Sequence, residues 1–362
     1  MLSPFEFREI ISGRRRGLGA MLWRSAFSIV EPLYSTAVRY RNWRYDTGRS
    51  SVTRVEVPVI SVGNLTLGGT GKTPMVEWLA RWFLERGVRV ALVSRGYGGN
   101  NSGTNDEALE LHQKLPDIPH VLNPRRAIGA REAIDKHAAQ LLILDDGFQH
   151  RRLARDLDIV LIDALEPFGF EHVFPRGTLR EPLAGFARAQ VIALSRADAV
   201  DEAARRALRE RVRAYNPDAV WLELSHAPRR LQNADGDSKP LELLRGKRLL
   251  AFCGIGNPAG FRHALASCGY EVVDFREFPD HHAYVPADIA QIDRWAEQAL
   301  ADAVICTHKD LVKVQQASLA SRPLWALAIG LEILSGRDEF ERRLDVLATR
   351  ARSLAGKDVP QG

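Results

Sequence analysis

From residue 57 onward, the sequence alternates short apolar runs with segments of helical periodicity, and this alternation constrains the fold more than any other feature. Such spacing is typical of strands in a parallel sheet with helices on its faces. We expect strands at residues 57–62, 88–94, 141–144, 159–162, 191–194, 220–224, 248–253, 271–275, 303–306 and 324–329. The pattern therefore predicts an α/β protein.

The alternation pauses once, in a polar stretch at residues 233–238 that suits either a linker or a hairpin. A second α/β pattern follows it. A chain of 362 residues is long for one layered domain and sufficient for two. We therefore expect two α/β/α domains, at residues 41–225 and 226–362, preceded by an N-terminal segment at residues 1–40.

The N-terminal segment contains an apolar stretch at residues 17–30, which follows Arg14, Arg15 and Arg16. The stretch is too short to span a bilayer, because a spanning helix takes about 20 apolar residues. Its apolar residues recur at helical spacing and form a stripe of Leu18, Leu22, Ala26, Ile29 and Leu33. This apolar stripe fits an amphipathic helix in a membrane interface, and it fits equally well a helix packed on the protein's own core.

The net charge of +5 favours an anionic partner, which the charge alone does not identify among phosphate, nucleic acid and an acidic membrane face. Three cysteines, Cys253, Cys268 and Cys306, lack the spacing of a metal site. We expect them to be reduced, buried core residues.

The strongest local motif is a glycine-rich loop between a predicted strand and a predicted helix, with the sequence Thr66-Leu67-Gly68-Gly69-Thr70-Gly71-Lys72-Thr73. In a P-loop, backbone N–H groups at a helix N-terminus bind nucleotide phosphates, and glycines allow the close approach. Lys72 is then expected to reach the β- and γ-phosphates, and the Thr73 hydroxyl to bind Mg²⁺. The usual pattern has glycine at position 66. The alternative is a glycine-rich turn with a surface lysine.

A second motif places Asp145 and Asp146 at the end of the predicted strand at residues 141–144. Carboxylates at this position hold Mg²⁺ in P-loop proteins, although an Asp-Gly turn alone also explains them. The pairs Asp106-Glu107 and Asp280-His281 are weak signals by themselves. Together, the first two motifs predict a P-loop NTPase-like first domain.

In combination, these segments resemble the tetraacyldisaccharide 4′-kinase (lipid A 4′-kinase) family. The resemblance rests on the loop at residues 62–74 and on motifs at 94–99, 145–150, 179–183 and 278–281. In this family, Thr at position 66 is the normal form. The chain departs from the family pattern at residues 105–108, at residues 195–198 and at His308, where the family has Glu.

The resemblance implies an ATP- and Mg²⁺-dependent kinase that phosphorylates the 4′-hydroxyl of an acylated glucosamine disaccharide 1-phosphate. It implies that Asp106 is the general base, supported by His281, and that the substrate is bound by Arg126, Arg180 and Glu181. It also implies a peripheral enzyme on the cytoplasmic face of the bacterial inner membrane, bound to an anionic membrane surface. Neither a nucleic acid nor a protein partner is implied.

The rival hypothesis is a P-loop GTPase or metal-insertion chaperone, which shares the strand–loop–helix core. Guanine selection commonly uses Asn/Thr-Lys-x-Asp after a strand, and Ser195-Arg196-Ala197-Asp198 is close to that pattern. Such chaperones tend to carry Cys or His ligands, for which this sequence has no convincing cluster. Comparing ATP with GTP distinguishes the two hypotheses.

Overall fold

The fold is built around a central strand, β1 (Val59–Asn64), whose six residues are all buried. The structure is a computed structural model that describes residues 2, 4–96, 111, 112, 114–280 and 282–355. Contacts divide the chain into two compact units. The first unit runs to Ser225 and resumes at Ile333, and the second consists mainly of residues 226–332.

The first unit contains a parallel sheet with the strand order β7-β6-β5-β1-β4-β2-β3. Its other strands are β2 (Val90–Ser94), β3 (His120–Leu122), β4 (Leu141–Asp145), β5 (Leu157–Asp163), β6 (Val191–Ser195) and β7 (Val220–Gln232). Strands β1, β2, β4, β5 and β6 are buried along their whole length, as expected for a sheet covered on both faces. The predicted parallel sheet is confirmed.

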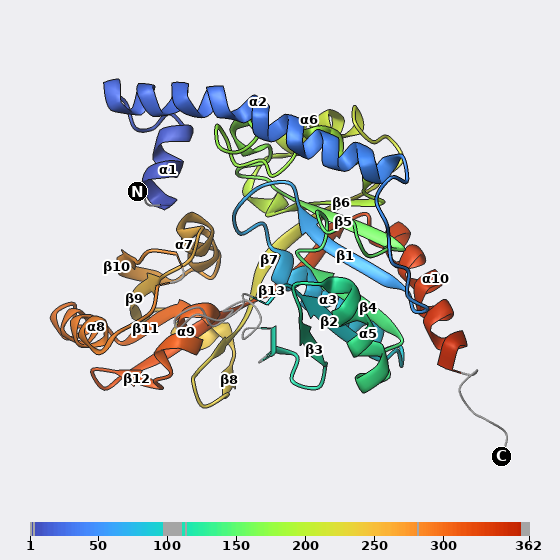
Figure 1. Cartoon of the computed structure of the whole chain (residues 1–362). Coiled ribbons are helices and arrows are strands. Elements are labelled where there is room, and N and C mark those ends of the chain that lie inside the picture. The colour runs from blue at the N-terminus through green and yellow to red at the C-terminus, as the bar shows by residue number, and fades with distance from the viewer. Residues whose placement is uncertain (1, 3, 97–110, 113, 281, 356–362) are drawn as a thin grey trace, which may run out of the picture. The chain divides into compact units, whose positions relative to one another are not determined.

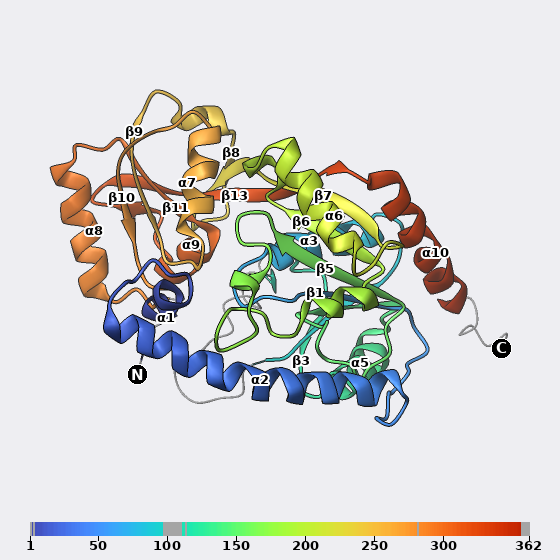
Figure 2. The same cartoon turned by 90° about the horizontal axis from the view of Figure 1, so that it is seen from above.

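Helices surround this sheet (Figure 1, Figure 2). Helix α3 (Lys72–Leu84) packs on β1 and β4, and α5 (Arg126–His137) packs on β2 and β3. The remaining helices of the unit are α1 (Pro4–Ile11), α2 (Leu18–Asp46), α6 (Glu202–Arg213), α10 (Arg337–Ala355) and the short 3₁₀ turns η1 (Gly169–Glu171), η2 (Leu183–Arg188) and η3 (Ala197–Ala199). Pro74 lies in the first turn of α3, and Gly87 follows its end with a φ of 73°.

The apolar stripe of α2 is exposed to solvent. Leu18, Leu22, Ile29 and Leu33 are 67–76% exposed, so the stripe does not pack on the protein's own core. Helix α2 is also longer than the predicted stretch, because it continues through Pro32 to Asp46. Among the described residues, no helix has both the length and the apolar content needed to cross a bilayer.

The second unit has a smaller parallel sheet in the order β10-β9-β11-β13. Its elements are β8 (Ser238–Lys239), η4 (Leu241–Leu244), β9 (Arg248–Cys253), α7 (Pro258–Ser267), β10 (Glu271–Glu277), α8 (Pro286–Gln298), β11 (Ala303–Thr307), α9 (His308–Val314), β12 (Ser318–Leu319) and β13 (Arg322–Ser335). β7 and β8 pair antiparallel, so residues 233–238 form a hairpin rather than a linker. The three cysteines are free and buried, as predicted.

The observed units differ from the predicted domains in the position of α10. We expected residues 226–362 to form one C-terminal domain, whereas the contacts assign α10 to the first unit. Phe340 of α10 is fully buried and stacks on Trp78 of α3, with 5.6 Å between the ring centroids. Arg350 also pairs with Asp156, 2.5 Å away. These contacts are non-local, and no pattern within α10 itself indicates them.

Candidate active site

The glycine-rich loop connects β1 to α3, and its glycines adopt backbone conformations that other residues rarely adopt. Gly68 has a φ of 118°, and Gly71 has a φ of 87° at the N-cap of α3. Gly71 offers no side chain to cap the helix, so the first N–H groups of α3 are available to an anion. The predicted strand–loop–helix context of a P-loop is therefore present.

Lys72, the first residue of α3, points at a carboxylate from the neighbouring β4 loop. Its Nζ lies 3.5 Å from Asp146 Oδ1, and its side chain is only 9% exposed. Arg180 Nη1 donates to both Asp146 oxygens, at 2.8 and 2.7 Å. Burial disfavours the charged form of Asp146, but the Lys72 ammonium and the Arg180 guanidinium outweigh burial and lower its pKa. Lys72 is thus a buried cation, not the surface lysine of the alternative interpretation.

The predicted metal ligands lie close to this cluster. Thr73 and Asp145 are both buried, and Val62 of β1 is in register with Asp145 of β4. Hydroxyl and carboxylate oxygens are the donors that Mg²⁺ prefers. The described residues contain no cluster of three His, Cys, Asp or Glu side chains suited to a metal.

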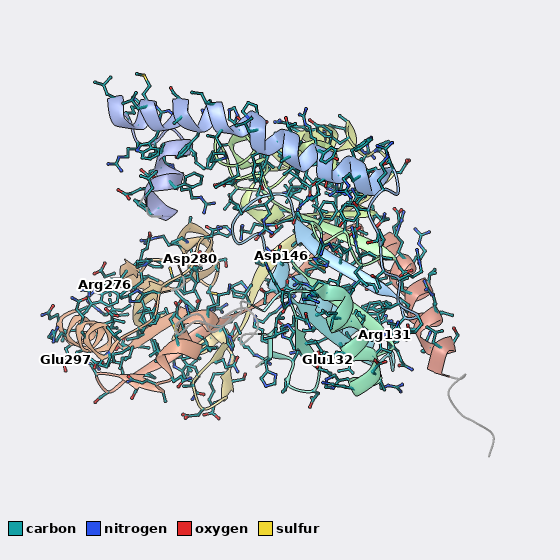
Figure 3. All side chains as sticks on the ribbon, viewed as in Figure 1. Arg131, Glu132, Asp146, Arg276, Asp280 and Glu297 are labelled. Carbon is teal, nitrogen blue, oxygen red and sulfur yellow. The ribbon has the colours of Figure 1, made fainter. Side chains whose placement is uncertain are left out.

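The turn after β4 approaches β1 more closely than any larger side chain would allow. A Cβ atom on Gly63 would lie 2.6 Å from Phe148 Cβ, and one on Gly147 would lie 2.9 Å from Ser61 Oγ. The N–H of Gly147 also donates to the carbonyl of Val62 at 3.0 Å. These two glycines therefore fix the position of Asp146 against the end of β1 (Figure 3).

Arg180 and Glu181, expected to bind substrate, occupy a loop that pairs with the P-loop. Arg180 N donates to the Leu65 carbonyl at 2.6 Å, and Leu67 N donates to the Thr178 carbonyl at 2.7 Å. The side chain of Glu181 is fully buried and accepts from Asn42, Gln149 and Arg188. Its two oxygens are therefore already occupied by partners in this structure.

Arg126, the third predicted substrate residue, begins α5 and is 3% exposed. Its Nη1 donates to the Asn123 carbonyl at 3.2 Å, and its Nη2 lies 3.5 Å from the Asp145 carbonyl. Nearby, His150 is half-buried, and burial together with Arg126, Arg155, Arg152 and Arg95 lowers its pKa to about 4. We assigned His150 no role, although it stands within the motif at residues 145–150.

The near match to a guanine motif lies at the end of β6. Arg196 has a φ of 55°, pairs with Asp163, and donates from Nη2 to the Gly69 carbonyl at 3.1 Å. Arg196 is therefore engaged with the P-loop backbone and with the end of β5.

Asp106 and His281, the predicted base and its support, lie outside the described residues. In the second unit, the neighbouring Asp280 lies against Gly256, where an added Cβ would be 2.9 Å from Asp280 Oδ2 (Figure 3). Asp310, two residues after His308, is fully buried and accepts from Gly254 N, Tyr284 and Thr307. Burial raises the pKa of Asp310 despite these hydrogen bonds.

Comparison with known proteins adds three findings. The profile of the tetraacyldisaccharide-1-P 4′-kinase family matches residues 23–349. The tetraacyldisaccharide 4′-kinase from Anaeromyxobacter sp. (strain Fw109-5) is 39% identical to this chain, over 95% of this chain and 96% of the relative. The tetraacyldisaccharide 4′-kinase from Syntrophus aciditrophicus (strain SB) is 37% identical, over 86% of this chain and 90% of the relative. A crystal structure of LpxK from Aquifex aeolicus in complex with ATP superposes with a TM-score of 0.70, at 28% identity, over 90% of this chain and 99% of that one.

Proposed function

Because this chain belongs to the tetraacyldisaccharide 4′-kinase family, we propose that its P-loop site transfers the γ-phosphate of ATP to the 4′-hydroxyl of an acylated glucosamine disaccharide 1-phosphate. The observation that carries this proposal is the group of Lys72, Asp146 and Arg180 beside the uncapped N-terminus of α3. Phosphoryl transfer needs positioning and charge stabilisation more than covalent chemistry, and this group supplies both.

Each residue of the site has a proposed role. The loop at residues 66–73 holds the triphosphate through backbone N–H groups, and Lys72 stabilises charge on the transferred phosphoryl group. Thr73, Asp145 and Asp146 would hold Mg²⁺, which when bound neutralises charge on the β- and γ-phosphates. Arg180 orients Asp146, to which it donates twice.

From the family resemblance, we carry over Asp106 as the base that accepts the proton of the attacking hydroxyl, with support from His281. In a loose transition state, proton transfer comes late, so most of the rate derives from alignment. Contacts of Arg126, Arg180 and Glu181 with the substrate remain predictions from the same resemblance.

We propose that α2 binds an anionic membrane surface, at the cytoplasmic face of the inner membrane. The large apolar residues of the stripe are exposed, namely Leu18, Leu22, Ile29 and Leu33. Three basic residues, Arg14, Arg15 and Arg16, lie just before the helix. An exposed apolar face beside basic residues suits a lipid interface, and an acylated substrate resides in one. A bound lipid surface would cover the apolar area that otherwise faces water.

Incubation of the purified chain with labelled ATP and acylated disaccharide 1-phosphate tests the transfer. We expect labelled product that disappears when EDTA is added and returns with excess Mg²⁺. Replacing ATP with labelled GTP tests the rival hypothesis. A protein that hydrolyses GTP and leaves the lipid unlabelled in both assays would contradict the proposal.

A further inference from the structure

Helix α2 has a second face, opposite in character to its apolar stripe, that forms hydrogen bonds with the loops of the active site. This inner face consists of Glu31, Tyr34 and Asn42, with the buried Val38 between them. With Val38 included, these residues follow one another at intervals of three, four and four positions, which puts them on one side of the helix. The exposed residues Ile29 and Leu33 belong to the other side.

The inner face holds the loop at residues 172–181 at three points along its length. The Glu31 carboxylate accepts from Val173 N at 2.8 Å and contacts His172 Nδ1 at 3.0 Å. The Tyr34 hydroxyl donates to the Arg180 carbonyl at 3.2 Å. Asn42 Nδ2 donates to Glu181 Oε2 at 2.8 Å.

From this loop, two series of contacts lead toward the P-loop. Gln149 Nε2 lies 3.0 Å from Glu181 Oε1 and 2.9 Å from the carbonyl of Asn64, the last residue of β1. Arg180, next to Glu181, places its guanidinium on Asp146, which lies 3.5 Å from Lys72. Both series of contacts begin at α2. One ends at Asn64, where β1 leads into the P-loop, and the other ends at Asp146, a proposed metal ligand.

Glu181 is the point where these contacts converge. Its side chain is fully buried, and Arg188 Nη2 adds hydrogen bonds of 3.0 and 2.9 Å to those from Asn42 and Gln149. A buried carboxylate is stable only when its oxygens accept hydrogen bonds. Removing one donor should therefore change the positions of the remaining donors to Glu181. A substrate could touch Glu181 only after this network opened.

We propose that Glu181 and Asn42 are positioning residues, through which the inner face of α2 sets the orientation of Arg180 and Asp146 for phosphoryl transfer. The two faces of α2 then have separable tasks, lipid contact outside and active-site alignment inside. The inner-face task rests on the proposed phosphoryl transfer at the P-loop site, and only the outer-face arm of the test below rests on the proposed membrane binding.

The test compares two hydrogen-bonded side-chain amides in the full-length enzyme. Asn42→Ala removes the donor to Glu181. Gln140→Ala removes the acceptor of the hydrogen bond that Arg89 N donates at the opposite, amino-terminal end of the strands. With substrate dispersed in detergent micelles, we expect Asn42→Ala to lower kcat about tenfold, since small misalignments of reacting groups are costly. The dissociation constant of ADP should change less than about twofold, because the P-loop itself is intact. Gln140→Ala should leave kcat near that of the wild type, even at a similar loss of Tm.

A second variant controls for misfolding and tests whether Asn42 acts through Glu181. Glu181→Gln keeps the side-chain shape but presents an NH₂ group to donors. Because Asn42 acts through Glu181, the double variant should be no slower than Glu181→Gln alone. A wild-type kcat in Asn42→Ala, additive losses in the double variant, or equal kcat losses in Asn42→Ala and Gln140→Ala would each overturn the proposal.

The outer-face arm uses Leu33→Ser, which we expect to reduce binding to anionic vesicles and to raise the KM for micellar substrate rather than lower kcat. A lower micellar kcat in Leu33→Ser would overturn the separation of the two faces. Unchanged vesicle binding would overturn the membrane proposal alone, because the Asn42→Ala arm needs no membrane.

Discussion

Replacing Lys72 with methionine tests the phosphate site with little disturbance of the fold. The substitution keeps the buried apolar stem and removes only the ammonium, which lies 3.5 Å from Asp146. Asp146 keeps both hydrogen bonds from Arg180, and its side chain is 36% exposed, so no buried charge is left unpaired. We therefore expect the free energy of unfolding to change by no more than about 1 kcal/mol.

The effect on catalysis should be far larger than the effect on stability. Loss of one preorganised charge-stabilising group typically costs about 10²–10³ in kcat, or roughly 3–4 kcal/mol of transition-state stabilisation. Nucleotide affinity should also fall, since a charge-assisted hydrogen bond contributes about 1.5–3 kcal/mol. The loss of kcat at saturating ATP, with Tm retained, is the signature expected of a catalytic lysine.

The assay measures kcat at saturating ATP with micellar substrate, and Tm by circular dichroism. Lys136→Met is the matched control, because Lys136 is 68% exposed on α5 and pairs only with the surface residue Glu132 in the contacts described. It should behave as the wild type in both measurements. A Lys72→Met enzyme that retains more than about one third of the wild-type kcat would refute the assignment.

Three further predictions concern other parts of the molecule. Truncation before about residue 41 should release the protein from anionic vesicles, as measured by co-sedimentation in a salt series. It also removes Glu31, Tyr34 and Val38 of the inner face and should therefore lower micellar kcat. Asp106→Ala and His281→Ala should each lower kcat strongly and the double variant little further, because residues that act as a unit have non-additive effects; additive losses would mean that the base is another residue. His150 has a pKa of about 4 in the folded protein and an ordinary value of 6.5. Between these pH values the unfolded chain binds a proton that the native chain does not. The free energy of unfolding should therefore fall as pH decreases from 6.5 to 4. His150→Gln should flatten the Tm profile in this interval, and equal slopes would contradict the shift.

The sequence predicts the parallel sheet because buried strands are continuous apolar runs that need no knowledge of their partners. The P-loop is predictable for a similar reason, since its glycines act through the backbone and lie next to Lys72 in the sequence. Short edge elements are not predictable in this way. β3 has three residues and owes its place to pairing with β2.

The roles of Glu181 and α2 depend on contacts that no local pattern contains. Asn42 and Glu181 are 139 residues apart, so a buried carboxylate there looks like any polar loop residue in the sequence. Pro32 is unfavourable inside a helix, yet α2 continues through it to Asp46. The contacts of Glu31 and Tyr34 on either side of Pro32 supply stabilisation that helix propensity lacks.

The return of α10 to the first unit has a consequence for the order in which the chain folds during synthesis. Domains generally fold as they leave the ribosome, the earlier one first. Here the P-loop unit cannot bury Trp78 against Phe340, or pair Asp156 with Arg350, until residues 226–332 have been made. Most of the second unit, residues 226–332, lies between these points and is synthesised earlier than α10. The nascent P-loop unit therefore stays incomplete, with apolar surface open to chaperones, while about a hundred residues are added.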